Sequence, residues 1–143
     1  MSKIYVIYWS STGNTEQMAN AVAQGIQEGG KIAEVVNVSN ATVDMVSDSD
    51  VIAFGCSAMG AETLDEGEFD PFITSIEGFL NGKTVGLFGS YGWGDGQWMR
   101  DWCDRMMNFG ATVVNDEGVI ANEAPDDGAV AECIALGKAL ANS

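Results

Sequence analysis

The chain of 143 residues contains no histidine. This absence excludes every mechanism that needs an imidazole base, including Ser-His-Asp catalysis, and it argues strongly against zinc sites of the Cys/His type. Only three cysteines are present, Cys56, Cys103 and Cys133, and none belongs to a Cys-x-x-Cys pair. We therefore expect neither a disulfide framework nor a metal centre.

Basic residues are scarce, and long apolar runs are missing. Six Lys and Arg face 21 Asp and Glu, which gives a formal net charge of −15. Such a surface repels nucleic acid and anionic lipid and attracts basic proteins, although solubility or adaptation to salt would favour the same composition. No stretch approaches the length of a membrane span, and Met1–Lys3 leads into an apolar run without a signal-peptide pattern. We expect a cytoplasmic protein without membrane contact.

Apolar and amphipathic segments alternate along the whole chain. The short apolar runs predict strands at residues 4–9, 32–38, 51–54, 85–88, and 112–114 with 119–120. The amphipathic segments predict helices near residues 16–27, 43–46, 70–79, 98–109 and 125–140. Strands that are apolar on both faces, separated by helices, imply a parallel sheet covered on both sides. We predict one domain over residues 1–143, a doubly wound three-layer α/β sandwich with a five-stranded parallel sheet.

Ligands of doubly wound sheets bind beyond the carboxyl ends of the strands, so the loops there are the first candidates for a binding site. The segment after the first predicted strand is rich in hydroxyls and precedes a helix, which predicts an anion site and most simply a phosphate site. It has neither the Walker A lysine nor a G-x-G-x-x-G pattern, so a terminal phosphomonoester fits better than a triphosphate. The alternative is an ordinary N-cap by Thr12 or Asn14. The segment consists of Ser10, Ser11, Thr12, Gly13, Asn14 and Thr15.

Two further loops offer apolar and aromatic side chains beside glycines. Residues 57–62 include Met59, a soft side chain able to cover a ring, next to Gly60, which suits a tight turn. Residues 89–96 form a glycine-rich segment that carries Trp93 between two glycines, well placed to stack on a flat ligand. The alternatives are that Met59 fills a gap in the core, with Gly60 in a plain turn, and that Trp93 folds back on the edge of the sheet. Together the three loops describe a ligand with one phosphate and a flat aromatic system, which is the shape of flavin mononucleotide (FMN).

Over essentially its whole length the chain resembles the short-chain flavodoxins. The matching motifs are residues 10–16, 55–60 and 87–96. The resemblance implies the flavodoxin-like strand order 2-1-3-4-5 and a bound FMN. It also implies a low-potential one-electron carrier that shuttles electrons between redox proteins through its semiquinone/hydroquinone couple, and not an enzyme.

The resemblance also assigns roles to residues. The first loop would bind the FMN phosphate, Met59 and Trp93 would lie on opposite faces of the isoalloxazine, and Glu62 would accept a hydrogen bond from flavin N3–H. The Gly60–Ala61 carbonyl would turn toward flavin N5, and the backbone of residues 90–94 would contact the pyrimidine end. The predicted cofactor-binding residues are Ser10, Ser11, Thr12, Gly13, Asn14, Thr15, Ser57, Ala58, Met59, Gly60, Ala61, Glu62, Ser90, Tyr91, Gly92, Trp93, Gly94 and Asp95.

Acidic residues around the loops predict the partners. We expect a monomer that forms transient complexes with basic-surfaced redox proteins, both reductases and low-potential acceptors. A small FMN-dependent quinone or NAD(P)H reductase is the alternative, but this chain has little room for the extra loops or nicotinamide site that such an enzyme needs. A receiver domain would need acidic residues at the end of the first strand, and a low-molecular-weight phosphatase would need a CxxxxxR loop after Cys56. We expect Cys56, Trp98 and Trp102 to lie in the core.

Overall fold

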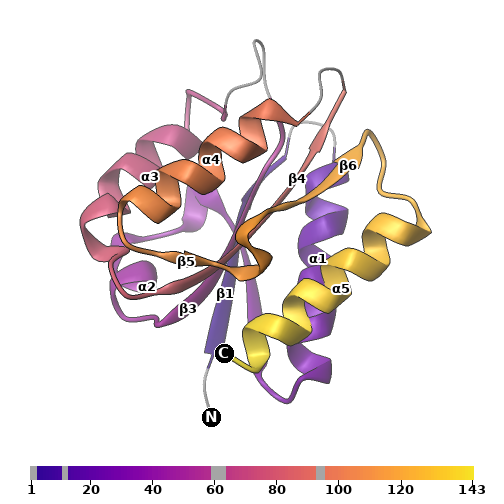
Figure 1. The fold of residues 1–143 in the computed structure, drawn as a ribbon, viewed down its shortest axis with the longest axis horizontal. Coiled ribbons are helices and arrows are strands. Elements are labelled where there is room, and N and C mark those ends of the chain that lie inside the picture. The colour runs from indigo at the N-terminus through magenta and orange to yellow at the C-terminus, as the bar shows by residue number, and fades with distance from the viewer. Residues whose placement is uncertain (1–2, 11–12, 59–63, 93–95) are drawn as a thin grey trace.

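The computed structural model describes residues 3–10, 13–58, 64–92 and 96–143 (Figure 1). Its strands are β1 (Lys3–Trp9), β2 (Ile32–Asn37), β3 (Val51–Cys56), β4 (Thr84–Tyr91), β5 (Thr112–Val113) and β6 (Val119–Asn122). Its α-helices are α1 (Asn14–Glu28), α2 (Val43–Ser47), α3 (Phe69–Ile76), α4 (Gln97–Asn108) and α5 (Asp127–Ala141). Short 3₁₀ turns are η1 (Val38–Asn40), η2 (Glu77–Phe79) and η3 (Val114–Asp116). Each predicted strand and helix region is therefore present.

The sheet has the strand order β2-β1-β3-β4-β5, with β6 also paired to β4. Every pairing is parallel, and the register places Trp9 of β1 beside Cys56 of β3. The predicted order 2-1-3-4-5 is confirmed. Because all the strands run the same way, the segments that follow β1, β3 and β4 emerge at one edge of the sheet, which we call the carboxyl edge.

Helices cover both faces of the sheet, and each face has its own core. Helices α1 and α5 lie on one face, and α2, α3 and α4 lie on the other (Figure 1). The side chains of β1 alternate between the two cores: Val6 packs on the α1/α5 side, and its neighbour Ile7 packs on the opposite side. Trp98 and Trp102 are only 2% and 1% exposed and lie in the α3/α4 core, as predicted.

Two glycines allow α1 and α5 to pack closely. A Cβ atom at Gly25 of α1 would lie 2.0 Å from the Ile134 carbonyl oxygen, and one at Gly137 of α5 would lie 2.1 Å from the Val22 carbonyl oxygen. These mid-helix glycines cost helix propensity but permit backbone contact between the helices. The α1 helix, which begins at the carboxyl edge, is therefore held firmly along its length.

The edge of the sheet beyond β4 differs from the prediction. The fifth strand is divided into β5, which pairs with Thr84–Val85, and β6, which pairs with Phe88–Tyr91. The division falls at Asn115 and Asp116, whose φ angles of 64° and 60° interrupt an extended strand. Strand β4 also continues through Gly89–Tyr91, which the sequence assigned to a loop, because β6 supplies hydrogen-bonding partners there.

Within the described ranges, no helix has the length and apolar character needed to cross a membrane.

Candidate functional site

The ends of β1, β3 and β4 are joined by main-chain hydrogen bonds at the carboxyl edge. The Ser57 N–H donates to the Trp9 carbonyl at 3.4 Å, and the Ala58 N–H donates to the Ser90 carbonyl at 2.9 Å. The three segments that the sequence singled out therefore start from one continuous platform.

The first segment leads into the N-terminus of α1. Gly13 precedes the helix with a φ of 93°, a left-handed conformation that favours glycine, and as the N-cap residue it has no side chain to cap the helix. The Ser10 hydroxyl accepts hydrogen bonds from the Gly13 N–H at 3.0 Å and the Glu16 N–H at 3.4 Å. Asn14 is the first helical residue and is not the N-cap, so the alternative of an Asn14 cap is not supported. The other N–H groups at the positive end of the helix dipole are suited to hold an anion.

Three hydroxyls from distant parts of the chain meet beneath these segments. The Thr15 Oγ1 atom lies 2.7 Å from Ser57 Oγ and 3.1 Å from Ser90 Oγ, and the two serine oxygens lie 3.4 Å apart. The Ser90 N–H also donates to Thr15 Oγ1 at 3.3 Å. Thr15 is fully buried, and Ser57 and Ser90 are each only 5% exposed. We call these three side chains the hydroxyl triangle.

A cleft of about 470 Å³ opens above the hydroxyl triangle. Its walls combine hydroxyls, small side chains and one aromatic ring, a lining that suits a ligand with a polar and a flat part. The Tyr91 ring packs against the Trp98 ring, with ring centroids 5.4 Å apart. The lining residues are Asn14, Ser57, Ala58, Ser90, Tyr91, Gly92, Glu123 and Ala124.

The Cys56 thiol at the end of β3 accepts a hydrogen bond from the residues that precede α3. The Asp65 N–H donates to Cys56 Sγ at 3.5 Å, and the Asp65 carboxylate accepts hydrogen bonds from the Glu68 and Phe69 N–H groups at the start of α3. Cys56 is fully buried, and this burial raises the pKa of its thiol to about 12. A thiol with that pKa stays protonated at neutral pH, which agrees with the packing role predicted for Cys56.

Many of the predicted site residues are brought together by the fold. Ser10, Gly13, Asn14 and Thr15 lie at the start of α1, and Ser57, Ala58, Ser90, Tyr91 and Gly92 lie at the ends of β3 and β4. The Ser90 hydroxyl points to Thr15 and Ser57. The other predicted residues lie outside the described ranges: Ser11, Thr12, Met59, Gly60, Ala61, Glu62, Trp93, Gly94 and Asp95.

Two cleft residues were missed by the sequence analysis. Glu123 and Ala124 follow β6 and line the cleft, and the Glu123 N–H donates to the Tyr91 carbonyl at 2.7 Å. Glu123 has a φ of 58°, unusual for a residue with a side chain and typical of a tight turn or a ligand site. Their position in the sequence could have identified them, because they follow the fifth strand region and so lie at the same edge of the sheet as the other site residues.

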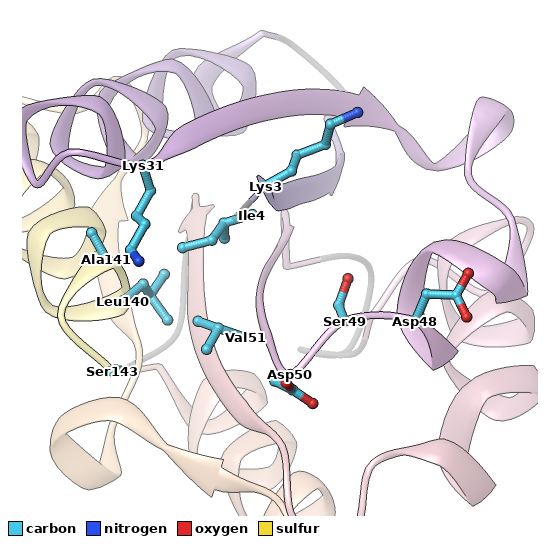
Figure 2. Close-up of a pocket in the computed structure, with 10 residues that line it drawn as sticks. All are labelled: Lys3, Ile4, Lys31, Asp48, Ser49, Asp50, Val51, Leu140, Ala141 and Ser143. Carbon is cyan, nitrogen blue, oxygen red and sulfur yellow. The ribbon is translucent and has the colours of Figure 1, made fainter. Parts of the chain in front are cut away.

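A second cavity, of about 300 Å³, lies at the opposite edge of the sheet. Figure 2 shows Lys31 pointing into it beside Leu140, with Asp50 across the opening. Its lining comes from the starts of strands and from the end of α5, so it lies away from the edge where doubly wound sheets bind ligands.

Comparison with known proteins agrees with this geometry. The flavodoxin family model matches residues 6–137. A flavodoxin of Clostridium beijerinckii is 50% identical over 137 residues, which cover 96% of this chain and 98% of that protein. A flavodoxin of Megasphaera elsdenii is 45% identical and covers 98% of this chain and 99% of that protein. The chain belongs to the flavodoxin family.

Solved structures agree with this membership. The solution structure of two-electron reduced Megasphaera elsdenii flavodoxin covers 98% of this chain with a TM-score of 0.90. A flavodoxin from the domain Archaea, 26% identical, covers 99% with a TM-score of 0.84. Flavodoxins bind FMN and carry electrons between redox proteins, so this flavodoxin is an FMN-binding electron-transfer protein and not an enzyme. The reductase alternative is not favoured.

The described residues fit FMN chemically. The hydroxyl triangle and the N-terminus of α1 provide neutral hydrogen-bonding groups for a phosphate, and Tyr91 lines the same cleft. Hydroxyls donate readily to phosphate oxygens, and no metal ion is needed to hold a single phosphomonoester.

Proposed function

We propose that this flavodoxin is a low-potential one-electron carrier whose FMN lies across the carboxyl edge, with the phosphate over the hydroxyl triangle. The observation that carries the proposal is the buried meeting of Thr15, Ser57 and Ser90 next to the N-terminus of α1. The three hydroxyls satisfy one another, and Ser57 and Ser90 also line the cleft beside the start of α1, where a phosphate finds polar groups. Bound FMN supplies the redox-active isoalloxazine, and the chain supplies its binding and its electrostatic environment.

Different parts of the site have different proposed tasks. Ser10, Gly13, Asn14, Thr15 and Ser57 hold the phosphate end with side-chain or backbone groups. Ala58, Ser90, Tyr91 and Gly92 form the platform on which the rest of the cofactor lies. The roles of Met59, Gly60, Ala61, Glu62, Trp93 and their neighbours, Ser11, Thr12, Gly94 and Asp95, remain those that the family resemblance implies.

The low potential is proposed on electrostatic grounds. Adding negative charge to the cofactor is unfavourable beside Asp65, Glu66, Glu68 and Glu123, four acids that lie near the carboxyl edge. Each exposed charge acts by only about 1 kcal/mol or less, but several act together with the phosphate. The four lysines of the chain are at Lys3, Lys31, Lys83 and Lys138, at the starts of strands or near the end of α5. The lysines lie far from the cofactor end and offset little of this field; of the two arginines, Arg105 is paired with Asp70 and Glu77, and Arg100 lies in the first turn of α4.

The acids near the carboxyl edge also support the proposed partners. No lysine lies among them, so a basic redox protein is attracted to the end where the cofactor is proposed to lie. Attraction through exposed charges produces fast, weak and salt-sensitive complexes, which suits reductases and low-potential acceptors that exchange electrons in turn.

We further propose that residues 1–143 act as one domain and as a monomer in the cytoplasm. The two cores share a single sheet, which supports one folding unit. All three cysteines are free and buried, which suits a reducing compartment. A charge of −15 opposes self-association.

The test is reconstitution followed by redox titration. The purified protein loaded with FMN should show flavin absorbance and take up electrons in two separate one-electron steps, the second well below the first in potential. Titration of the apoprotein with oxidised FMN and with riboflavin, which has no phosphate, measures how much the phosphate contributes to the binding affinity. Failure to bind FMN, or steady oxidation of NADH by the protein alone, would contradict the proposal.

A further inference from the structure

Strand β6 forms a border of the sheet next to the proposed cofactor site. Among the described residues it pairs with β4 alone, so only one of its two sides is occupied. A groove of about 330 Å³ is lined by β6, by the turn that follows it and by the start of α5, which is the next helix in Figure 1. Ala124 lines both this groove and the cleft described above, so the two hollows are adjacent.

The hydrogen bonds of β6 show which of its backbone groups face outward. The Glu123 N–H donates to the Tyr91 carbonyl at the end of β4. Along a parallel strand, the N–H and C=O groups of successive residues point to alternate sides. Ala121 therefore faces β4, as Glu123 does, whereas Ile120 and Asn122 direct their backbone groups to the other side. Within the described part of the chain no strand pairs with that side, and such an edge is a template for a further strand.

The two faces of this strand edge differ in charge. On the α5 face, the groove is lined by the carboxylates of Asp126 and Glu132. On the opposite face, Ile120 packs against the α3/α4 core, and a Cβ atom at Gly96 would lie 3.1 Å from Ile120 Cδ1 and 3.8 Å from Arg100 Nη1. None of the described residues that line the groove is lysine or arginine. Basic side chains are therefore favoured on the α5 face, and apolar ones beside Ile120.

We propose that the outer edge of β6 binds an extended segment of a redox partner, which joins the sheet as a further strand. Successive side chains of an extended segment point to opposite faces, so a segment with basic and apolar residues in alternation matches both faces of this edge. The Ile120 and Asn122 backbone groups hold the segment, and Asp126 and Glu132 select its charge. The Asp126 carboxylate accepts from the Ala129 N–H at 2.8 Å and keeps further accepting positions.

The charges favour a basic partner over a second copy of this chain. A second copy brings the same acids to the edge, and each copy carries a net charge of −15. The inference rests on the proposed function and adds where and how the partner docks. Because Ala124 borders both hollows, a segment bound along β6 lies beside the cofactor cleft, which suits electron transfer.

Amide hydrogen exchange tests the strand pairing directly. The probe is an octapeptide of alternating lysine and valine with blocked ends, added to the full chain loaded with FMN. The Ile120 and Asn122 amides should exchange rapidly in the free protein and about tenfold more slowly when nine-tenths of the protein is bound. The Ala121 amide, which faces β4, should be protected with or without the peptide. Protection of all three amides before the peptide is added would overturn the inference.

Two variants at Ile120 separate backbone pairing from side-chain contact. Ile120→Pro and Ile120→Ala both remove the branched side chain, but only proline removes the outward N–H, which takes no part in pairing with β4. Ile120→Pro should bind the peptide at least about fivefold more weakly than Ile120→Ala, as expected for the loss of one hydrogen bond. Equal affinities would contradict strand addition. If Ile120→Pro does not fold, the exchange pattern of the wild-type protein decides.

Charge variants test the selection of a basic segment. Asp126→Asn keeps an oxygen that caps α5, and Asp126→Asn and Glu132→Gln should each weaken peptide binding by about twofold or more at low salt and by less as the salt concentration rises. Asp44→Asn removes an exposed charge in α2 and should leave the affinity unchanged. Equal weakening by all three variants would show that only the net charge acts.

The remaining outcomes separate this inference from the proposed function. An octapeptide with glutamate in place of lysine should not bind, and binding of both peptides alike would overturn the choice of a basic partner. A dimer of the wild-type protein that is lost in Ile120→Pro would assign the edge to a second copy instead. Wild-type protein that fails to bind FMN would refute the proposed function, whereas FMN-loaded protein that ignores the lysine–valine peptide would refute only this inference.

Discussion

The two edges of the sheet treat polar groups in opposite ways. At the amino edge, cations are paired within the protein: buried Lys83 donates to the carbonyls of Ser47, at the end of α2, and Ser49, and Lys3 lies 3.0 Å from Glu34. At the carboxyl edge, neutral hydroxyls are bonded to one another, and the N-cap residue of α1 is Gly13, which has no side chain. Polar groups at the amino edge serve stability, while those at the carboxyl edge keep capacity for a ligand.

Thr15→Val should break this comparison most strongly, because it removes the centre of the hydroxyl triangle while keeping the shape of the side chain. Ser57, Ser90 and the Ser90 N–H each lose a partner in a buried place. We expect the free energy of unfolding to fall by about 2 kcal/mol and FMN affinity to fall more than tenfold. Urea denaturation of the apoprotein and FMN titration measure the two effects.

Thr112→Val is the matched control for this variant. It makes the same chemical change at an exposed position of β5. There we expect the free energy of unfolding to change by less than about 0.5 kcal/mol and the FMN affinity to stay the same. A Thr15→Val protein as stable and as tight-binding as wild type would mean that the triangle is incidental packing.

The segments that form the carboxyl edge were predictable, but their meeting was not. The spacing of the apolar residues and the composition predicted the strands and helices, and the hydroxyls next to the start of a helix predicted a phosphate site. The hydrogen bonds between Thr15, Ser57 and Ser90 depend on strand order and register, which link positions far apart in the chain. Local patterns carry no information on such distances between side chains.

The two errors of the sequence-based prediction, at residues 89–91 and at Glu123, have the same origin. Residues 89–91 looked like a loop because glycine is common there, but pairing with β6 makes them strand. Glu123 was overlooked because its position depends on where β6 ends, and its left-handed φ is not encoded by a glycine. Non-local pairing decided both cases.

Lys83→Met should affect stability without affecting the cofactor. The long apolar stem is kept, but the Ser47 and Ser49 carbonyls lose the ammonium that donates to them. Because hydrogen bonds from a charged group contribute about 1.5–3 kcal/mol, we expect a loss of about 2 kcal/mol in the free energy of unfolding. The FMN dissociation constant should stay within twofold of wild type.

Lys138→Met provides the comparison within the same edge. Lys138 lies 3.3 Å from Glu28, and both side chains are about half exposed. The free energy of unfolding should therefore fall by at most about 1 kcal/mol. Denaturation curves of the two variants side by side give the difference. A large drop in FMN affinity for Lys83→Met would show that the two edges are not independent.

Glu123→Asn should sharpen the electrostatic part of the comparison. Asparagine tolerates a φ near 58° and removes the charge beside the cleft. The potential for adding an electron should rise by about 40 mV or less, since an exposed unit charge acts by about 1 kcal/mol at most. Glu123→Gly removes the charge and also relieves the backbone, so equal shifts in both variants assign the effect to charge. Redox titration at two salt concentrations measures it, and a fall in potential would contradict the proposal.

The smallest expected effect is at Cys56. This residue lies at the carboxyl edge, but its thiol has hydrogen-bond partners within the protein, as the polar groups of the amino edge have. Its thiol accepts from Asp65, and burial raises its pKa to about 12, so the folded protein should hold it protonated and unreactive toward iodoacetamide at pH 8. In unfolded protein the thiol ionises near pH 8.5, so its burial favours folding fully below that pH and progressively less as the pH rises toward 12. The Tm of wild type should therefore fall more steeply above pH 9 than that of Cys56→Ala. Rapid labelling of the folded protein, with loss of electron transfer but not of FMN, would make Cys56 part of the redox site.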